Sequence, residues 1–390
     1  MSARQRHRPS EPAPNNIVLV FQSMRFKSGR DTIAGVYRYA KRRGWQVQCF
    51  ETIPRGRGLR NLLETWRPLG CLVAVSLLNG SPPPSFGRTP VVFLGRIAGR
   101  RLNVEHDSRE TSRLAVRELA LGKPAAWGFF GPKERPRWSQ LRQRFYCEAV
   151  AEAGGLARPF PWAGIRPSTP AFRTALHAYL KGMPRPCALF VAADYLAGEV
   201  LDAAHHENLR LPHDLSIVSV DNDEQICENL TPTLSSVMPD FEGAGYAMCE
   251  LLERRLSDPR LTSETLSYGP LQLVRRASSR PPTGSRHVNR TLEFIRTHVT
   301  DRIGVADVAA HLGYQRRSLE RLFRAATGGT VLDAIHAIKL EAVKAIVRDR
   351  RNLLSGIAER VGFSSEAHLK KFFKSQTGMT MSAWRNAFSG

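Results

Sequence analysis

Cysteines are few in this 390-residue chain, and no two of the six are spaced like metal ligands or a redox pair. They stand singly in apolar surroundings, so buried, reduced thiols are expected. Long apolar runs are also missing, since none approaches the ~18 residues that a membrane span requires. The first residues, MSARQRHRPSEPAPNN, have no apolar centre of the kind found in signal peptides. We therefore expect a cytoplasmic protein with no membrane contact.

Acidic residues are outnumbered: 35 Asp and Glu stand against 57 Lys and Arg, which leaves a net charge of +22. Such an excess indicates a phosphate-rich or acidic partner, and nucleic acid is the leading candidate. The excess is densest at the carboxyl end. From Ser285 to Gly390, 18 basic and 9 acidic residues leave a net charge of +9.

Short apolar runs alternate with helix-length stretches over the first 275 residues. This alternation predicts parallel sheets with crossover helices, a doubly wound α/β architecture. The apolar runs are residues 16–21, 45–51, 71–78, 90–95, 126–131, 187–193 and 215–222. The helix-length stretches are residues 29–43, 108–121, 140–153 and 194–208.

Strand patterns end near residue 275, where a Ser-, Pro- and Arg-rich segment begins. That segment is typical of a linker, and helical patterns follow it to the end of the chain. We therefore expect a disordered tail over 1–14, a ligand-sensing domain over 15–275, a linker over 276–287 and an all-helical domain over 288–390.

The helical region contains one unit twice, in the segments Gly304–Thr330 and Leu354–Thr380. Matching residues are 49 positions apart before the internal turn and 50 apart after it. In each copy an apolar-faced helix runs into a glycine, Gly313 or Gly362, which can close a helix in the left-handed conformation. A second helix then starts after polar residues. Each copy is therefore expected to be a helix-turn-helix motif.

The second helix of each motif begins with residue types that contact base edges and phosphates in a major groove. The candidate DNA-binding residues are Gln315, Arg316, Arg317, Ser318 and Arg321 in the first copy, and Ser364, Ser365, Glu366, His368, Lys370 and Lys371 in the second. Between the copies, Thr330–Asp349 has no Gly or Pro and is expected to form a helix roughly 25 Å long. Such a spacer would hold the two motifs near the ~34 Å repeat of the groove, so one chain would read two successive grooves.

The second motif resembles the carboxyl-terminal domain of AraC/XylS-type transcription regulators. Their pattern IAxxVGFxSxxxFxxxFKxxxGxTPxxYR corresponds here to IAERVGFSSEAHLKKFFKSQTGMTMSAWR. Met381 and Trp384 replace the usual Pro and Tyr, and neither is expected on the DNA face. The resemblance covers residues 288–388 and implies an all-helical domain with two helix-turn-helix motifs.

The amino-terminal part resembles the LacI-like sensor domain of xylose-operon activators, a two-lobed periplasmic-binding-protein-like fold. Similar segments are SIVSVDNDEQICENLTPTLSSV, RPRWSQLRQRFY and VAADYLAGEVLDAAHHENLRLP. The resemblance implies a sugar effector, and it implies that the two doubly wound sheets form separate lobes around the ligand.

Sugar recognition uses carboxylates, amides, a cation and an aromatic face, and parallel sheets bind ligands at the carboxyl ends of their strands. The candidate ligand-binding residues, most of which follow strand-like runs, are Asp221, Asp194, Arg137, Trp138, Asn222, Ser23, Arg25 and Asp107. A structural role is the alternative: Asp194 and Asp221 are also placed to cap helices, and Trp138 to lie in the core.

These patterns predict a ligand-responsive, sequence-specific transcription regulator, an activator of an operon for xylose or a related sugar. The expected partners are DNA, a monosaccharide effector, a second copy of the chain in a homodimer and, for an activator, RNA polymerase. No cofactor or metal is expected, and no nucleophile with a base partner stands out, so we expect no enzyme. Two alternatives stay open: a doubly wound enzyme with a basic tail that localises it to DNA, and a protein that coats DNA without sequence preference.

Overall fold

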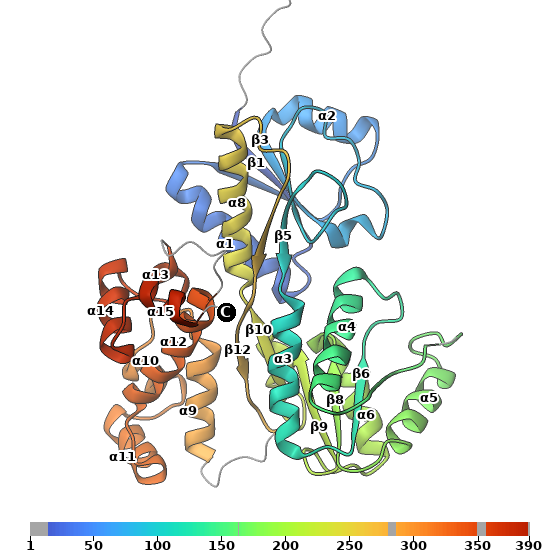
Figure 1. Ribbon diagram of the computed structural model, residues 1–390, viewed down its shortest axis with the longest axis vertical. Helices are drawn as coiled ribbons and strands as arrows, with labels where there is room; N and C mark the ends of the chain where they lie inside the picture. The colour runs from blue at the N-terminus through green and yellow to red at the C-terminus, as the bar shows by residue number, and fades with distance from the viewer. Residues whose placement is uncertain (1–14, 163, 280–285, 349–355, 389–390) are drawn as a thin grey trace, which may run out of the picture. The chain divides into compact units, whose positions relative to one another are not determined.

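The computed structural model describes residues 15–162, 164–279, 286–348 and 356–388 (Figure 1). The expected tail and residues 280–285 of the expected linker lie outside these ranges. The described residues form two compact units, one within 1–105 and 241–266 and the other within 106–240 and 267–390. The chain therefore passes from one unit to the other after Glu105, Asp240 and Leu266.

The first unit is built on a six-stranded sheet in the order β11-β5-β4-β3-β1-β2. Neighbours from β5 through β2 pair in parallel. Its strands are β1 (Asn15–Phe21), β2 (Gln46–Phe50), β3 (Pro68–Ala74), β4 (Val91–Leu94), β5 (Leu102–His106) and β11 (Glu264–Tyr268). Its helices are α1 (Lys27–Arg43), α2 (Arg57–Trp66) and α8 (Phe241–Ser257), with a 3₁₀ turn at Val75–Leu78.

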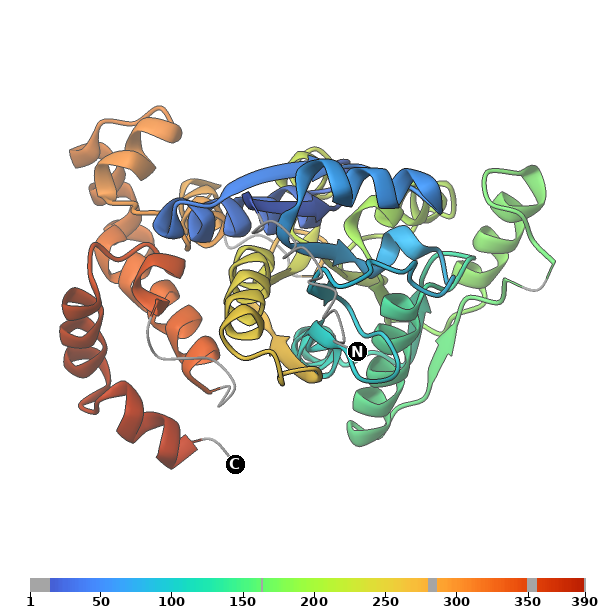
Figure 2. The same ribbon diagram turned by 90° about the horizontal axis from the view of Figure 1, so that it is seen from above.

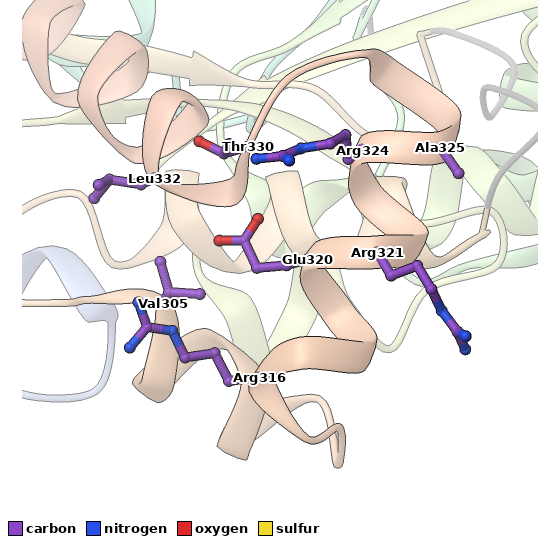
Figure 3. A pocket seen from close by; sticks show the side chains of 8 residues that line it. All are labelled: Val305, Arg316, Glu320, Arg321, Arg324, Ala325, Thr330 and Leu332. Carbon is purple, nitrogen blue, oxygen red and sulfur yellow. The ribbon is translucent and has the colours of Figure 1, made fainter.

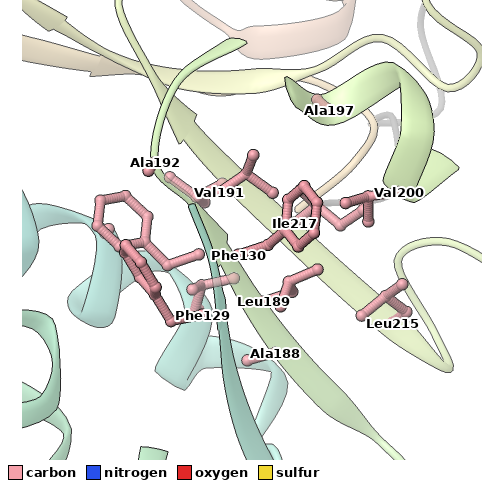
Figure 4. Packing of buried hydrophobic residues seen from close by; sticks show 14 of the residues in the cluster. Phe129, Phe130, Ala188, Leu189, Val191, Ala192, Ala197, Val200, Leu215 and Ile217 are labelled. Carbon is pink, nitrogen blue, oxygen red and sulfur yellow. The ribbon is translucent and has the colours of Figure 1, made fainter. Parts of the chain in front are cut away.

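The second unit contains a six-stranded sheet in the order β12-β10-β9-β8-β6-β7, parallel except where β12 joins β10. Its strands are β6 (Ala126–Phe130), β7 (Ala157–Pro159), β8 (Cys187–Val191), β9 (Leu215–Val220), β10 (Ser235–Pro239) and β12 (Pro270–Val274). Its helices are α3 (Ser108–Leu119), α4 (Arg137–Glu152), α5 (Pro170–Lys181), α6 (Ala197–His206) and α7 (Glu224–Cys227), with 3₁₀ turns at Ala120–Gly122 and Asp194–Leu196. Every residue of β6, β8 and β9 is buried, as continuous apolar runs in a parallel sheet require (Figure 4).

The predicted α/β architecture is confirmed, because each of the seven apolar runs contains a strand. The predicted run over 71–78 extends beyond its strand: β3 ends at Ala74, and Val75–Leu78 form a 3₁₀ helix. The predicted helix over 194–208 likewise starts as a 3₁₀ turn before α6. The doubly wound sheets place the strand ends, where polar side chains collect, at one edge of each sheet.

Helices α1 and α8 of the first unit cross at a pair of glycines. A Cβ atom on Gly35 would lie 1.9 Å from the backbone oxygen of Glu242, and one on Gly245 would lie 1.9 Å from that of Thr32. Real Cβ atoms do not approach backbone oxygens so closely, so any side chain at either position would force the helices apart. The close crossing thus depends on the absence of side chains there.

Gly245→Ala is expected to lower the free energy of unfolding by about 2 kcal/mol, because the added methyl group overpacks a backbone contact. Gly198→Ala, within α6, is the matched control, since its Cβ would meet nothing within 4 Å. The control is expected to be neutral or slightly stabilising, because alanine favours the helix. Chemical denaturation of both variants measures the difference, and equal stabilities would contradict the tight crossing.

The carboxyl-terminal part of the second unit is all helical in its described residues (Figure 2, orange to red). Its helices are α9 (Arg286–Thr297), α10 (Val305–His311), α11 (Arg316–Thr327), α12 (Val331–Arg348), α13 (Ile357–Arg360), α14 (Glu366–Thr377) and α15 (Met381–Phe388). Met238, Leu271 and Val274 of the sheet belong to the same buried apolar cluster as residues of α12, α13 and α14. This cluster joins the helical domain to the edge of the sheet that carries β10 and β12.

Candidate nucleic-acid interface and ligand site

The two copies of the repeated unit fold in the same way. Gly313 and Gly362 follow the first helices with φ values of 73° and 66°. After each glycine the next backbone N–H bonds back into the first helix, from Tyr314 to the oxygen of Ala309 at 2.8 Å and from Phe363 to that of Ala358 at 2.7 Å. These αL turns redirect the chain into α11 and α14, so both copies are helix-turn-helix motifs.

Each second helix buries large apolar residues on one face and exposes its cations on the other. Leu319 and Phe323 are buried in α11, as are Leu369, Phe372 and Phe373 in α14. Exposed residues among the predicted DNA contacts are Gln315, Arg316, Arg317, Arg321, Ser364, Ser365, His368, Lys370 and Lys371, while Ser318 is half-buried. The first turns of both helices therefore present donors and cations to solvent, as groove reading requires.

Glu366 differs from the other predicted DNA contacts. Its Oε1 accepts hydrogen bonds from the backbone N–H groups of Gly356 at 2.7 Å and Ala358 at 3.3 Å. The carboxylate therefore caps the start of α13 and ties it to α14. This placement gives Glu366 a structural role in the second motif, because a carboxylate held by backbone N–H groups is not directed to a base edge.

A pocket of about 590 Å³ adjoins the first motif (Figure 3). Arg316, Glu320, Arg321 and Arg324 of α11 line it together with the beginnings of α10 and α12. Glu320 Oε2 accepts a hydrogen bond from the backbone N–H of Val331 at 3.3 Å, so this carboxylate caps α12. Figure 3 shows the side chain of Arg321 directed away from that of Glu320. The sequence singled out Arg316 and Arg321 but not Arg324, which adds a third cation to this face.

Helix α12 spans most of the stretch predicted as a spacer, and at 1.5 Å per residue its 18 residues extend about 27 Å. Lys339, in its middle, is buried, and its Nζ donates to the carbonyls of Asp301 at 2.7 Å, Val361 at 3.0 Å and Gly362 at 3.3 Å. Burial lowers the pKa of Lys339 to about 8, and Asp301 opposes that shift. The lysine thus ties the spacer to the turn of the second motif.

The candidate ligand residues Asp194, Asp221 and Asn222 come together at the ends of β8 and β9. Asp194 is buried, and its carboxylate accepts hydrogen bonds from the hydroxyl groups of Ser219 and Ser236 and, at 2.7 Å, from the backbone N–H of Asp223. These donors occupy both oxygens of Asp194. Its role in this arrangement is to hold the turn that follows β9.

Asp221 stands in that turn with a φ of 115° and points a partly buried carboxylate at Arg142. Arg142 Nη2 lies 3.5 Å from Asp221 Oδ1, and its Nη1 donates to the oxygen of Ala192. The guanidinium also lies 4.9 Å from the ring centroid of Trp138. Aspartate, arginine and tryptophan therefore form one cluster in which a carboxylate and an aromatic face share a cation.

Arg142 was not among the residues predicted from the sequence. It lies one helical turn after Trp138 on α4, but the sequence does not show that this arginine is buried. Arg142 also faces His106, whose pKa is lowered by burial first and by this guanidinium second. His106 hydrogen-bonds through Nε2 with Thr111 Oγ1 at 3.0 Å.

The remaining predicted ligand residues have the following local surroundings. Asp107 caps α3, because its Oδ1 accepts a hydrogen bond from the backbone N–H of Glu110 at 3.0 Å. Arg137 is exposed at the first turn of α4. Ser23 and Arg25 follow β1 in the first unit, where Ser23 Oγ accepts the N–H of Arg25 at 3.3 Å. Asn222 is fully buried, and its Oδ1 accepts from Arg276 Nη1 at 2.9 Å.

Burial raises the pKa of Asp221 to about 7, with Asp194 adding to the rise and Arg142 opposing it. The folded chain then holds a proton that the unfolded chain, with a pKa near 4, has lost. Stability is therefore lost as pH rises from about 4 through about 7. Between pH 5 and 8, the wild type is expected to lose on the order of 2 kcal/mol relative to Asp221→Asn, which cannot ionise. Thermal unfolding of the wild type and of Asp221→Asn between pH 5 and 8 measures this relative loss of stability. If the stabilities of the two proteins change with pH in parallel, the raised pKa of Asp221 is contradicted.

Within the described ranges, no cluster of three or more His, Cys, Asp or Glu side chains has a metal-binding arrangement. Nor does any helix there combine the length and apolar character that a membrane crossing needs.

Comparisons with known proteins match two families. A profile for a periplasmic-binding-protein-like domain matches residues 103–279, and one for a helix-turn-helix domain matches residues 308–387. The xylose operon regulatory protein of Escherichia coli (strain K12) is 24% identical over 286 residues, which cover 72% of each chain. That of Haemophilus influenzae is 26% identical over 215 residues, 54% of each chain.

Solved structures agree on the fold. A structure of the xylose-binding transcription activator xylR aligns with a TM-score of 0.55 and 20% identity, covering 96% of this chain and 98% of that one. The ribose operon repressor from Lactobacillus acidophilus aligns with a TM-score of 0.56 and 14% identity over 68% of this chain and 99% of that one. The first of these spans the sensor-like fold and the helical domain together, whereas the second matches a smaller part of the chain.

Proposed function

We propose that this chain activates an operon for xylose or a related sugar. It joins a periplasmic-binding-protein-like domain to an AraC-type helix-turn-helix domain and is homologous to xylose operon regulatory proteins. The chain is therefore a sugar-responsive DNA-binding transcription regulator. The observation that carries this proposal is the pairing of two exposed cationic recognition helices with a carboxylate–arginine–tryptophan cluster in the same chain.

The sensor is proposed to bind its sugar without transforming it. Asp221, Arg142 and Trp138 supply an acceptor, a cation and an aromatic face, which suit the hydroxyls and the ring of a monosaccharide. Ser23, Arg25, Asp107 and Arg137 stay proposed contacts, and Asp194 and Asn222 are proposed to act by holding the turn. A ligand that contacts Asp221 differently in two states of the sensor would shift the balance between them.

The sensor is proposed to span 15–275 and the DNA-binding domain 288–390, with the chain between them as a linker. Its first residues, Arg276–Ser279, are wholly or partly buried against the sheet, and Ser278 Oγ donates to the oxygen of Ile217 at 2.8 Å. We further propose a cytoplasmic homodimer in which the face of residues 29–43 pairs, and an activator that contacts RNA polymerase.

A thermal-shift screen of the purified chain against pentoses, hexoses and sugar alcohols tests the sensor. A sugar at a hundredfold its dissociation constant is expected to stabilise the chain by about 2.7 kcal/mol. Asp221→Ala is expected to abolish the shift, whereas Arg173→Ala, which removes an exposed cation on α5, is expected to retain it. If no sugar shifts the melting temperature of the wild type, the sugar-sensing proposal fails.

A further inference from the structure

Arg276 connects the turn after β9 to the helical domain. Its side chain is completely buried, and Nη1 donates to Asn222 Oδ1 at 2.9 Å and to the oxygen of Leu234 at 3.0 Å. On the other side, Nε donates to Glu293 Oε1 at 2.5 Å. Because Glu293 belongs to α9, one guanidinium spans the distance from the turn to the first helix of the DNA-binding domain.

The turn at the near end of this connection is strained. Asp221 and Asn222 have φ values of 115° and 50°, both in the left-handed region. Non-glycine residues keep such conformations only where their surroundings hold them. Asn222 is held by its backbone N–H, which donates to Ser236 Oγ at 2.9 Å, and by its side chain, which accepts from Arg276. A change in the backbone of Asp221 therefore moves the acceptor that Arg276 uses.

The far end of the connection is an ion pair between the fully buried guanidinium of Arg276 and the partly exposed carboxylate of Glu293. Burial raises the pKa of Glu293, and among the neighbouring cations Arg276 opposes that rise most strongly, so this guanidinium favours the charged carboxylate. A buried charge that loses its partner is costly, which means that Glu293 cannot separate from Arg276 cheaply. A displacement of Arg276 is therefore expected to move helix α9 with it.

We propose that Arg276 is a positioning residue that couples the Asp221–Asn222 turn to α9, so that sugar occupancy of the sensor resets the helical domain through this side chain. The claim that sugar occupancy resets the helical domain rests on the proposed function, because it requires that the ligand contact Asp221. The coupling between the turn and α9 stands on the hydrogen bonds alone and is testable without a ligand.

A second contact between the sheet and the helical domain provides a control. Asp240, the last residue of the second unit before the chain enters the first, forms an ion pair with Arg360 of α13. This pair joins the sheet to the second motif, whereas Arg276 joins it to α9. Breaking this ion pair weakens the attachment of the helical domain to the sheet but leaves Asn222, the acceptor of Arg276, unchanged. Arg360→Gln therefore separates a general weakening of that attachment from a loss of the Asn222–Arg276–Glu293 connection.

Hydrogen exchange of the full chain without ligand tests the coupling. Asn222→Gly removes the acceptor while glycine keeps the positive φ, and Glu293→Gln removes the charge at the far end. Each is expected to speed amide exchange in α9 about tenfold, and Glu293→Gln is expected to speed exchange at residues 221–223 as well, since coupling is reciprocal. The double variant is expected to match the larger single effect, because both substitutions act through one side chain.

Arg360→Gln is expected to speed exchange in α13 while residues 221–223 stay within about twofold of wild type. The coupling is overturned if Asn222→Gly leaves α9 at the wild-type rate, if the two effects multiply in the double variant, or if Arg360→Gln disturbs the turn as strongly as Glu293→Gln does. Exchange in β8 serves as a check that no variant has unfolded as a whole.

In a last experiment, hydrogen exchange of the wild type and of Asn222→Gly is measured with saturating D-xylose. The wild type is expected to change its exchange in α9, and Asn222→Gly is expected to lose most of that response. If D-xylose binds and shifts the melting temperature but leaves α9 equally responsive in both chains, the relay is overturned while the sugar-sensing function stands. If D-xylose has no effect on the wild type, the sugar proposal fails, and the ligand-free variants still decide the coupling.

Discussion

Arg317→Ala is expected to weaken binding to a selected DNA site by about 1–3 kcal/mol, roughly 5- to 150-fold, and to relax the preference at one base pair. The reason is that Arg317 is exposed in the first turn of α11, the part of a recognition helix that enters the major groove, and arginine there pairs with the edge of guanine. Site selection from a random DNA library by the wild type, followed by titration of single-base variants, measures both effects.

Arg173→Ala is the matched control for this prediction, since it removes one exposed cation on α5 of the sensor. It is expected to leave DNA affinity within about twofold, because surface charges far from the interface are screened by salt. A loss that is the same on every DNA sequence for Arg317→Ala and for Lys371→Ala would instead indicate a protein that coats DNA without reading it.

Lys339→Met is expected to lower the free energy of unfolding by about 3 kcal/mol, because methionine keeps the length of the side chain but leaves one buried and two partly buried carbonyls without their donor. The second motif should suffer most, since two of those carbonyls belong to its turn. Chemical denaturation of the full chain measures the loss of stability, and DNA binding at the second half-site reports its local consequence.

Lys344→Met provides a comparison on the same helix. Lys344 Nζ lies 2.8 Å from Glu341 Oε1, whose side chain is 69% exposed, so the pair is a surface interaction. Its loss is expected to cost no more than about 0.5 kcal/mol. Equal destabilisation by the two substitutions would show that the spacer tolerates losing the Lys339 contacts and that the buried lysine does not anchor the turn.

The strands of the sheet interiors could be predicted because burial on both faces gives an unbroken apolar run. The strands β5, β7, β10, β11 and β12 were absent from the predicted set. Strand β7 has only three residues, Ala157–Pro159, and β11 alternates polar residues at the end of its sheet, so neither gives a continuous apolar signal. Strand β10 is wholly buried but includes two serines, Ser235 and Ser236, whose hydroxyls bond to neighbouring segments.

The exposed face of the two recognition helices was easier to predict than the Asp221–Arg142–Trp138 cluster, because a helix face is local in sequence. Glu366 was the exception, since its position in the first turn of α14 does not reveal that it caps α13. The ligand cluster joins α4 with the strand ends after β8 and β9, so Arg142 could be recognised only once those elements were assembled. Arg276 lies in a segment whose composition is typical of a linker, so the sequence does not indicate that its side chain is buried and forms long-range hydrogen bonds.

Nuclease footprinting of the wild-type chain on its selected DNA site, with and without D-xylose, tests most directly whether a sugar sensor governs a pair of groove-reading motifs. The account predicts protection of two major-groove segments about one helical turn apart, and a change in the position or affinity of that protection when the sugar is added. Protection that covers any DNA evenly and does not respond to any sugar that binds the chain would contradict it.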